Sequence, residues 1–253
     1  MNFFAAFGER VIFMIAYVGA LSSLTMQTFR ALPQFNWNRT LYQASKLGVD
    51  SILIVTIISV FMGMVMTYQL AAKFVEFGAQ SVAGGAVFIA LARELAPIMT
   101  GVTVAGRVGA AITAEIGSMK VTEQLDALEV MATPPVSYLV LPRVLACMVM
   151  LPILVGFSDA IGSLGGYFVA SNYTDINSAV YMQSIKDFAT VKDLYGGLIK
   201  GIFFGFIIAL VGCYHGMNAK TGAEGVGVAT TESVVHSIIL IFISNYFLSV
   251  LIF

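Results

Sequence analysis

Long apolar runs separated by short polar stretches set the pattern of this chain. Five runs are long enough to cross the roughly 30 Å hydrocarbon core of a bilayer, because a helix rises about 1.5 Å per residue. These runs cover residues 49–72, 82–113, 138–170, 195–217 and 234–253. The pattern predicts an all-α, polytopic membrane protein in which residues 1–253 form a single transmembrane domain with five spans.

The N-terminal stretch is apolar over residues 11–26, and its length reaches only about 24 Å. We expect residues 1–47 to form an interfacial N-terminal segment whose helix lies in the plane of the membrane surface. Its headgroup-level anchors would be Arg30, Trp37, Arg39, Tyr42 and Lys46. A tilted sixth span is the alternative. A signal peptide is less consistent with the sequence, because no clear small-x-small cleavage site follows.

Residues 118–135 interrupt the apolar pattern with a short amphipathic helix, predicted over residues 122–131. Its apolar side carries Leu125, Leu128 and Val130, and its acidic side carries Glu123, Asp126 and Glu129. Two consecutive prolines at 134 and 135 end it, because proline lacks the N–H and disfavours helix in the residue before it. A polar helix between two spans must lie at the membrane surface, where it is either open to a soluble partner or a solvated connector.

Lys and Arg are distributed unevenly over the short loops, which predicts the orientation. If the N-terminus is cytoplasmic, that side holds Arg10, Arg30, Arg39, Lys46, Lys120, Arg143 and Lys220. The opposite side holds only Lys73, Lys186 and Lys192. The bias places the acidic helix in the cytoplasm.

Composition narrows the function further. Hydrophobic residues make up 58% of the chain, and the formal net charge is −1. Without a basic cluster, a nucleic-acid partner is not expected. The two cysteines, Cys147 and Cys213, stand alone in apolar runs, and the two histidines lack metal-ligand spacing, so we expect no metal site.

Three ionisable residues lie well inside the predicted spans: Arg93, Glu94 and Lys200. Charges at such depth cost several kcal/mol unless they are paired or hydrated, so each is a candidate functional residue. We expect the two cations to hold a lipid phosphate, with Glu94 holding Arg93 in place. In the alternative, Arg93 and Glu94 are a structural pair and Lys200 extends outward to the interface.

Enzymatic activity has little support in the sequence. Ser158, Asp159 and His236 are the residue types of a hydrolytic triad, but no GxSxG motif surrounds Ser158. No P-loop motif is present either. Small residues recur every four positions at Gly197, Gly201, Gly205 and Ala209, which favours close helix packing within the chain or between two copies.

The run LARELAPIMTGVTVAGRVGAAITAEIGSMKVTEQLDALEVMATPP, residues 91–135, closely resembles the MlaE-type permeases of bacterial ABC lipid transporters. That group includes the toluene-tolerance (YrbE) proteins and related chloroplast lipid permeases. ATTESVVHS, residues 229–237, is a second matching block, and the looser resemblance extends from the first span to the C-terminus.

The resemblance implies a homodimeric permease subunit in the bacterial inner membrane, with the acidic helix acting as a coupling helix for cytoplasmic ATPase subunits. It implies that ATP and Mg are bound by those subunits and that this chain carries no cofactor. A periplasmic hexamer of mammalian-cell-entry domains and, in some members, a STAS-domain protein complete the assembly. The cargo is phospholipid, whose transport maintains outer-membrane lipid asymmetry. The alternative is a membrane scaffold that recruits cytoplasmic partners without transporting anything.

Particular positions match the family's functional residues. Those of the coupling helix are Glu123, Gln124, Asp126, Ala127, Leu128 and Glu129. Arg93 and Glu94 match the pair lining the lipid pocket, while Gln69 and Lys200 match polar positions near it. We expect Tyr68 and Leu70 to contact acyl chains. Asn245 replaces an aspartate and Glu232 an arginine found in relatives, which affects the ion pairing expected in the pocket.

Overall fold

The computed structural model describes residues 3–174 and 176–253, so residues 1, 2 and 175 of the predicted domain lie outside its described part. Almost all of the described chain is helical, and no strand occurs in these ranges. The helices (α) and short 3₁₀ or π turns (η) are α1 (Phe3–Arg30), η1 (Leu32–Gln34), α2 (Trp37–Glu76), η2 (Gln80–Val82), α3 (Ala83–Ala90), η3 (Leu91–Leu95), α4 (Ala96–Val104), η4 (Ala105–Gly109), α5 (Ala110–Val121), α6 (Gln124–Val130), η5 (Val136–Val140), α7 (Leu141–Tyr173), α8 (Ser178–Phe188), α9 (Val191–Met217) and α10 (Gly222–Ile252).

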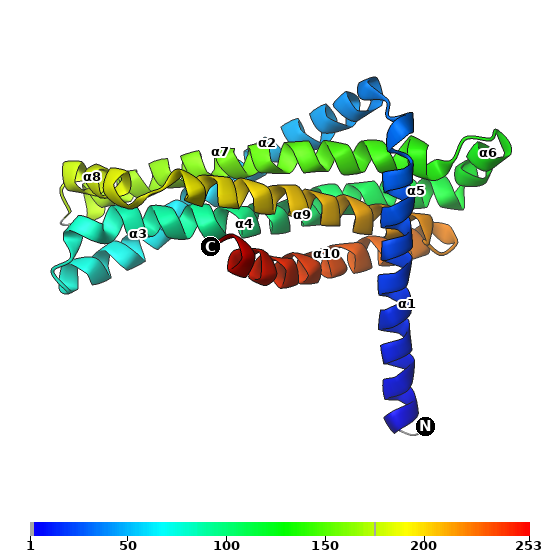
Figure 1. Ribbon diagram of the computed structural model, residues 1–253, viewed down its shortest axis with the longest axis horizontal. Coiled ribbons are helices and arrows are strands. Elements are labelled where there is room, and N and C mark those ends of the chain that lie inside the picture. Colours follow the sequence, from blue (N-terminus) through cyan, green and yellow to red (C-terminus); the bar gives the residue numbers. More distant parts are fainter. Residues whose placement is uncertain (1–2, 175) are drawn as a thin grey trace.

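Five helical segments are long and apolar enough to cross a membrane, which confirms the predicted all-α, polytopic class. They are Trp37–Glu76, Gln80–Val121, Val136–Tyr173, Val191–Met217 and Gly222–Ile252. They run side by side in one bundle, with α6 at one end and α8 at the other (Figure 1). The structure adds α8 within the polar stretch after the third span, for which the polarity pattern predicts no helix.

Helix α1 lies across the bundle near the α6 end (Figure 1). It is not among the five candidate spans found in the described residues. Its placement in the membrane surface, or as a tilted sixth span, stays a prediction. No helix break occurs at residue 47, the end of the predicted interfacial segment. Instead, α2 begins ten residues earlier, where the side chain of Asn36 accepts a hydrogen bond from the Arg39 amide at 3.2 Å. Its 40 residues span about 60 Å, so α2 extends well beyond the hydrocarbon core.

Small residues let the spans approach one another closely, and they do so within one chain. A side chain at Gly63 on α2 would overlap the backbone of Gly162 on α7. Gly205 on α9 faces the Cys147 carbonyl of α7 in the same way, and Gly197 faces the Ala92 carbonyl in η3. The four-residue repeat on α9 is therefore a packing seam inside the protomer.

The main hydrophobic core lies where α4, α5, α7 and α9 meet. Its large, fully buried side chains include Phe204, Ile208 and Leu151. A smaller cluster under α8 buries Tyr181 against Ala71 and neighbouring residues. Packing in this core fixes the central helices relative to one another. Helix α10 is less buried, because only 11% of its most apolar window is buried.

We expect Gly205→Leu to destabilise the protein, because the added side chain meets α7 backbone that cannot move aside. The loss in the free energy of unfolding should be on the order of 3 kcal/mol. Thermal unfolding in detergent measures it. Gly227→Leu is the matched control, since nothing lies within 4 Å of a Cβ at that helical position. Equal melting temperatures for the two variants would contradict the packing seam.

Candidate functional site

Lys200 is a fully buried charge with hydrogen bonds to three partners. Its side chain is 0% exposed, and its ammonium group donates three hydrogen bonds. The acceptors are the Arg93 carbonyl at 2.7 Å, the Glu94 carboxylate at 2.8 Å and the Ser249 hydroxyl at 2.8 Å. All three ammonium donors are used, so Lys200 neither extends outward nor has a donor left for a ligand. Direct binding of phosphate by Lys200 stays a prediction, and it would require one of these three hydrogen bonds to be exchanged.

The local sequence explains why Lys200 is needed at this place. Pro97 has no N–H, so it cannot donate to the carbonyl of Arg93 four residues earlier. The helix adjusts through the π turn η3, in which the Ala96 amide bonds the Leu91 carbonyl five residues back. Lys200, reaching across from α9, supplies a donor to the Arg93 carbonyl.

Arg93 pairs with a residue that the sequence analysis did not single out. Its Nε donates to Asp193 at 2.6 Å, and its guanidinium carbon lies 4.5 Å from the centre of the Phe253 ring. The predicted pairing of Arg93 with Glu94 is therefore wrong. The Arg93 side chain is 37% exposed, unlike that of Lys200.

Asp193 is fixed by the start of α9. Its second carboxylate oxygen accepts from the Thr190 amide at 2.7 Å and from the Thr190 hydroxyl at 2.8 Å. This is a capping box, and the T-x-x-D pattern that forms it was the available sequence signal. One carboxylate thus caps a helix and orients Arg93.

Glu94 joins α10 to the cluster. Besides Lys200, it accepts from the Asn245 amide at 2.8 Å and from the Ser249 hydroxyl at 2.9 Å. An amide at 245 can donate to the carboxylate, whereas an aspartate there would add a second negative charge beside it. Arg93, Glu94, Lys200 and Asn245 therefore form one group, which we call the polar cluster together with Asp193 and Ser249.

The other predicted lipid contacts lie elsewhere. Tyr68 and Gln69 line a groove of about 500 Å³ between α2 and α7, together with apolar residues such as Phe61 and Val169. Leu70 is the next residue on α2, half-buried and outside the groove lining. No hydrogen bond or ion pair in the described part of the chain joins these three residues to the polar cluster.

At the opposite end of the bundle, α6 presents an acidic surface. Of the six predicted coupling residues, all but Leu128 are exposed, and Leu128 is half-buried. Leu125 is buried beneath them and Asp126 pairs with Lys120 at 3.1 Å. Val130 is 88% exposed, so its predicted place beside Leu125 is wrong. A turn through Glu123, whose φ is +60°, redirects the chain from α5 into α6.

The chain is similar to proteins of a known family. The family description "Permease MlaE" matches residues 40–251. A probable ABC transporter permease protein of Synechocystis is 47% identical over 232 residues, which cover 91% of this chain and 88% of the relative. A probable ABC transporter permease protein of Rickettsia bellii is 39% identical over 100% of this chain and 98% of its own length.

The chain belongs to the MlaE permease family.

As a family member, it is a multi-pass permease subunit of an ABC transporter, which works with ATPase partners. A chloroplast relative is TRIGALACTOSYLDIACYLGLYCEROL 1 of Arabidopsis thaliana. It is 35% identical over 216 residues, covering 85% of this chain and 62% of that protein. The relatives' names are those of transporter permeases, a non-catalytic kind of subunit.

The three residues considered as a hydrolytic group in this permease have separate contacts. The Ser158 hydroxyl lies 2.7 Å from the Ser59 hydroxyl. The His236 ring bonds the His215 ring at 2.9 Å. Asp159 has no hydrogen-bond partner among the described residues. A serine–histidine–aspartate relay requires these groups to bond one another, so the arrangement does not support one.

We expect Lys200→Met to destabilise this permease, because Glu94 would keep a charge without its ammonium partner. The free energy of unfolding should fall by about 3 kcal/mol. Combining Lys200→Met with Glu94→Leu should recover part of the loss, as shown by melting temperatures in detergent. Lys192→Met, an exposed cation on the same helix, is the control. If Lys200→Met melted with this control, the buried pair would not stabilise the fold.

Proposed function

We propose that this permease moves phospholipid between the inner membrane and a periplasmic carrier built from mammalian-cell-entry domains. Such transport would maintain the lipid asymmetry of the outer membrane. The observation that carries the proposal is the separation of two features along one bundle. The polar cluster lies toward the α8 end, and the exposed acidic helix α6 lies at the other end (Figure 1).

The assembly that fits this proposal is a homodimer with its N-terminus and α6 in the cytoplasm. Cationic residues support this orientation, since Lys46, Lys120 and Arg143 belong to the α6 end. Cytoplasmic ATPase subunits that hold ATP and Mg dock on α6. A hexamer of mammalian-cell-entry domains covers the periplasmic end, and a STAS-domain protein can accompany the ATPase.

Within the polar cluster, Arg93 is the residue we assign to the lipid phosphate. Its Nε is held by Asp193, and its two terminal nitrogens have no hydrogen-bond partner in the described ranges. Beside it, Lys200 and Asn245 hold the Glu94 carboxylate by hydrogen bonds. Lys200 also holds the Arg93 carbonyl. This division of roles replaces direct binding by two cations.

The acyl chains require a separate apolar surface, because phosphate and hydrocarbon need different surroundings. The α2–α7 groove offers one, with Tyr68 and Gln69 at its edge and Leu70 beside it. We therefore assign the groove to hydrocarbon and Arg93 to the headgroup.

Arg93→Ala should reduce the amount of phospholipid that co-purifies with the permease by about tenfold, because a charge-assisted contact to phosphate is lost. Lipid extraction followed by mass spectrometry measures the change. Lys73→Ala is the matched control, an exposed cation near the same end of the bundle. Unchanged lipid content in Arg93→Ala would reject its role. Absence of bound lipid from the unaltered protein would instead favour a scaffold that transports nothing.

Replacing both Asp126 and Leu128 with alanine should uncouple the partner ATPase from the permease. Removing an apolar side chain and a charge from a docking helix should reduce lipid-stimulated ATP hydrolysis about tenfold. Hydrolysis by the reconstituted complex in lipid vesicles is the measurement. Asp187→Ala, which removes an exposed acid on α8, should leave the rate unchanged. Full stimulation in the double variant would show that α6 does not couple.

A further inference from the structure

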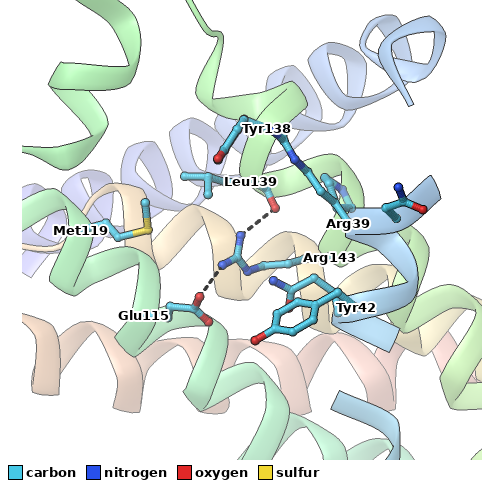
Figure 2. Close-up of a pocket in the computed structure, with 10 residues that line it drawn as sticks. Arg39, Tyr42, Glu115, Met119, Tyr138, Leu139 and Arg143 are labelled. Carbon is cyan, nitrogen blue, oxygen red and sulfur yellow. Dashed lines mark hydrogen bonds and ion pairs between the residues drawn. The ribbon is translucent and has the colours of Figure 1, made fainter. Parts of the chain in front are cut away.

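A pocket with charged residues in its lining lies at the α6 end, far along the bundle from the polar cluster. It has a volume of about 400 Å³ and is formed by the first turns of α2, by α5 and by η5 with the start of α7 (Figure 2). Figure 2 shows Glu115 and Arg143 joined across it, with Arg39 over Tyr138 at one side. No functional assignment made above uses this pocket.

Positive charge exceeds negative charge around the pocket. Arg143 is 3% exposed and donates to Glu115 at 2.9 Å and to the Leu139 carbonyl at 2.9 Å. Lys46 also approaches the Glu115 carboxylate, at 3.6 Å. One carboxylate therefore faces two cations, and Arg39 adds a third positive charge whose side chain pairs with no carboxylate in the described part. An anion entering the pocket would balance this excess.

Two buried polar atoms beside the pocket have no hydrogen-bond partner among the described residues. One is the Nε of Arg143, a donor, and the other is the side-chain oxygen of Gln43, an acceptor. Buried polar groups are normally satisfied, so a missing partner needs an explanation. Gln43 and Arg143 both line the pocket, so a ligand there that offers both an acceptor and a donor matches the two atoms. A phosphate next to an amine or hydroxyl has this chemistry.

The remaining lining is apolar and aromatic, which suits a lipid better than a free ion. Met119, Leu139 and Pro142 line the pocket, and Tyr42 stands at its edge. Trp37, one turn earlier on α2 than Tyr42, is 63% exposed. Exposed tryptophan and tyrosine collect at the membrane–water boundary, where lipid headgroups lie. Arg39 stacks 3.8 Å from the centre of the Tyr138 ring and keeps its charge at this level.

We propose that this pocket is a second phospholipid headgroup site, in the cytoplasmic leaflet, selective for headgroups that carry an N–H or O–H donor beside the phosphate. Ethanolamine and glycerol headgroups meet this requirement, and choline does not. The proposal rests on the proposed orientation, in which α6 is cytoplasmic. The Glu115–Arg143 pair also joins the two ends of the hairpin that carries α6, so an occupied pocket lies at the base of the coupling helix.

A photo-crosslinking experiment on the full-length permease in nanodiscs tests the site. The probe is a phosphatidylethanolamine with a photoreactive group on its acyl chain, and mass spectrometry identifies the labelled peptides. We expect labelling of residues 38–43 and 138–143. Arg39→Gln should reduce it by about tenfold. Arg30→Gln is the control, since it removes an exposed cation at the end of α1, and it should leave the labelling unchanged. Because Arg39 is exposed, this variant keeps the fold.

Competition identifies the ligand. Unlabelled phosphatidylglycerol and phosphatidylethanolamine should displace the probe, whereas phosphatidylcholine and inorganic phosphate should not. Equal displacement by phosphatidylcholine would overturn the headgroup selectivity, and displacement by phosphate alone would overturn the lipid assignment. No labelling at these peptides, or labelling unaffected by Arg39→Gln, would overturn the site. Arg93→Ala should leave this labelling intact, so failure here is distinguishable from failure of the proposed function.

Discussion

A buried ammonium ion holds the polar interior of this bundle together. In hydrocarbon every backbone polar group needs a partner from the protein, and Pro97 removes the one that an α-helix would give to the Arg93 carbonyl. Lys200 compensates from α9 while also neutralising Glu94. The π turn η3 and the hydrogen bonds of Lys200 to Glu94 and Ser249 therefore belong together. All of them follow from the hydrogen bond that Pro97 cannot donate. The Arg93 side chain takes no part in this compensation, because it pairs with Asp193 and stays 37% exposed.

The segment from Gln80 to Val121 connects the two ends of the molecule. It carries Arg93 and Glu94 of the polar cluster in η3 and leads directly into α6 at its other end. Glycine contacts such as Gly197 against the Ala92 carbonyl hold it tightly to α9. Packed helices of this kind move as units and deform little. We therefore propose that ATPase closure on α6 reaches the lipid site as a shift of whole helices.

Local sequence properties predicted most of the architecture. The five spans, the surface position of α6 and the crosswise α1 follow from hydropathy and length, which depend on neighbouring residues only. Arg93, Glu94 and Lys200 stood out because charges are rare in apolar runs. The structure brings these three residues together around the Lys200 ammonium group.

The pairing of those charges could not be predicted, because it depends on contacts across about a hundred positions of sequence. The T-x-x-D pattern at residues 190–193 indicates a helix cap, but it carries no information that Asp193 lies against Arg93. Ser249 carried no signal at all. Val130 fits the apolar face of a helical pattern, yet packing against the bundle covers Leu125 and part of Leu128 and leaves Val130 88% exposed. Tertiary packing, and not periodicity, decided each of these cases.

Transfer of labelled phospholipid in reconstituted vesicles tests the central claim most directly, namely that this chain transports lipid with energy from a separate ATPase. Vesicles containing the permease with its ATPase and the periplasmic carrier should transfer lipid only when ATP and Mg are present. Vesicles containing the permease alone should show no nucleotide-dependent transfer. Equally fast transfer by the permease alone, without any nucleotide, would contradict the account.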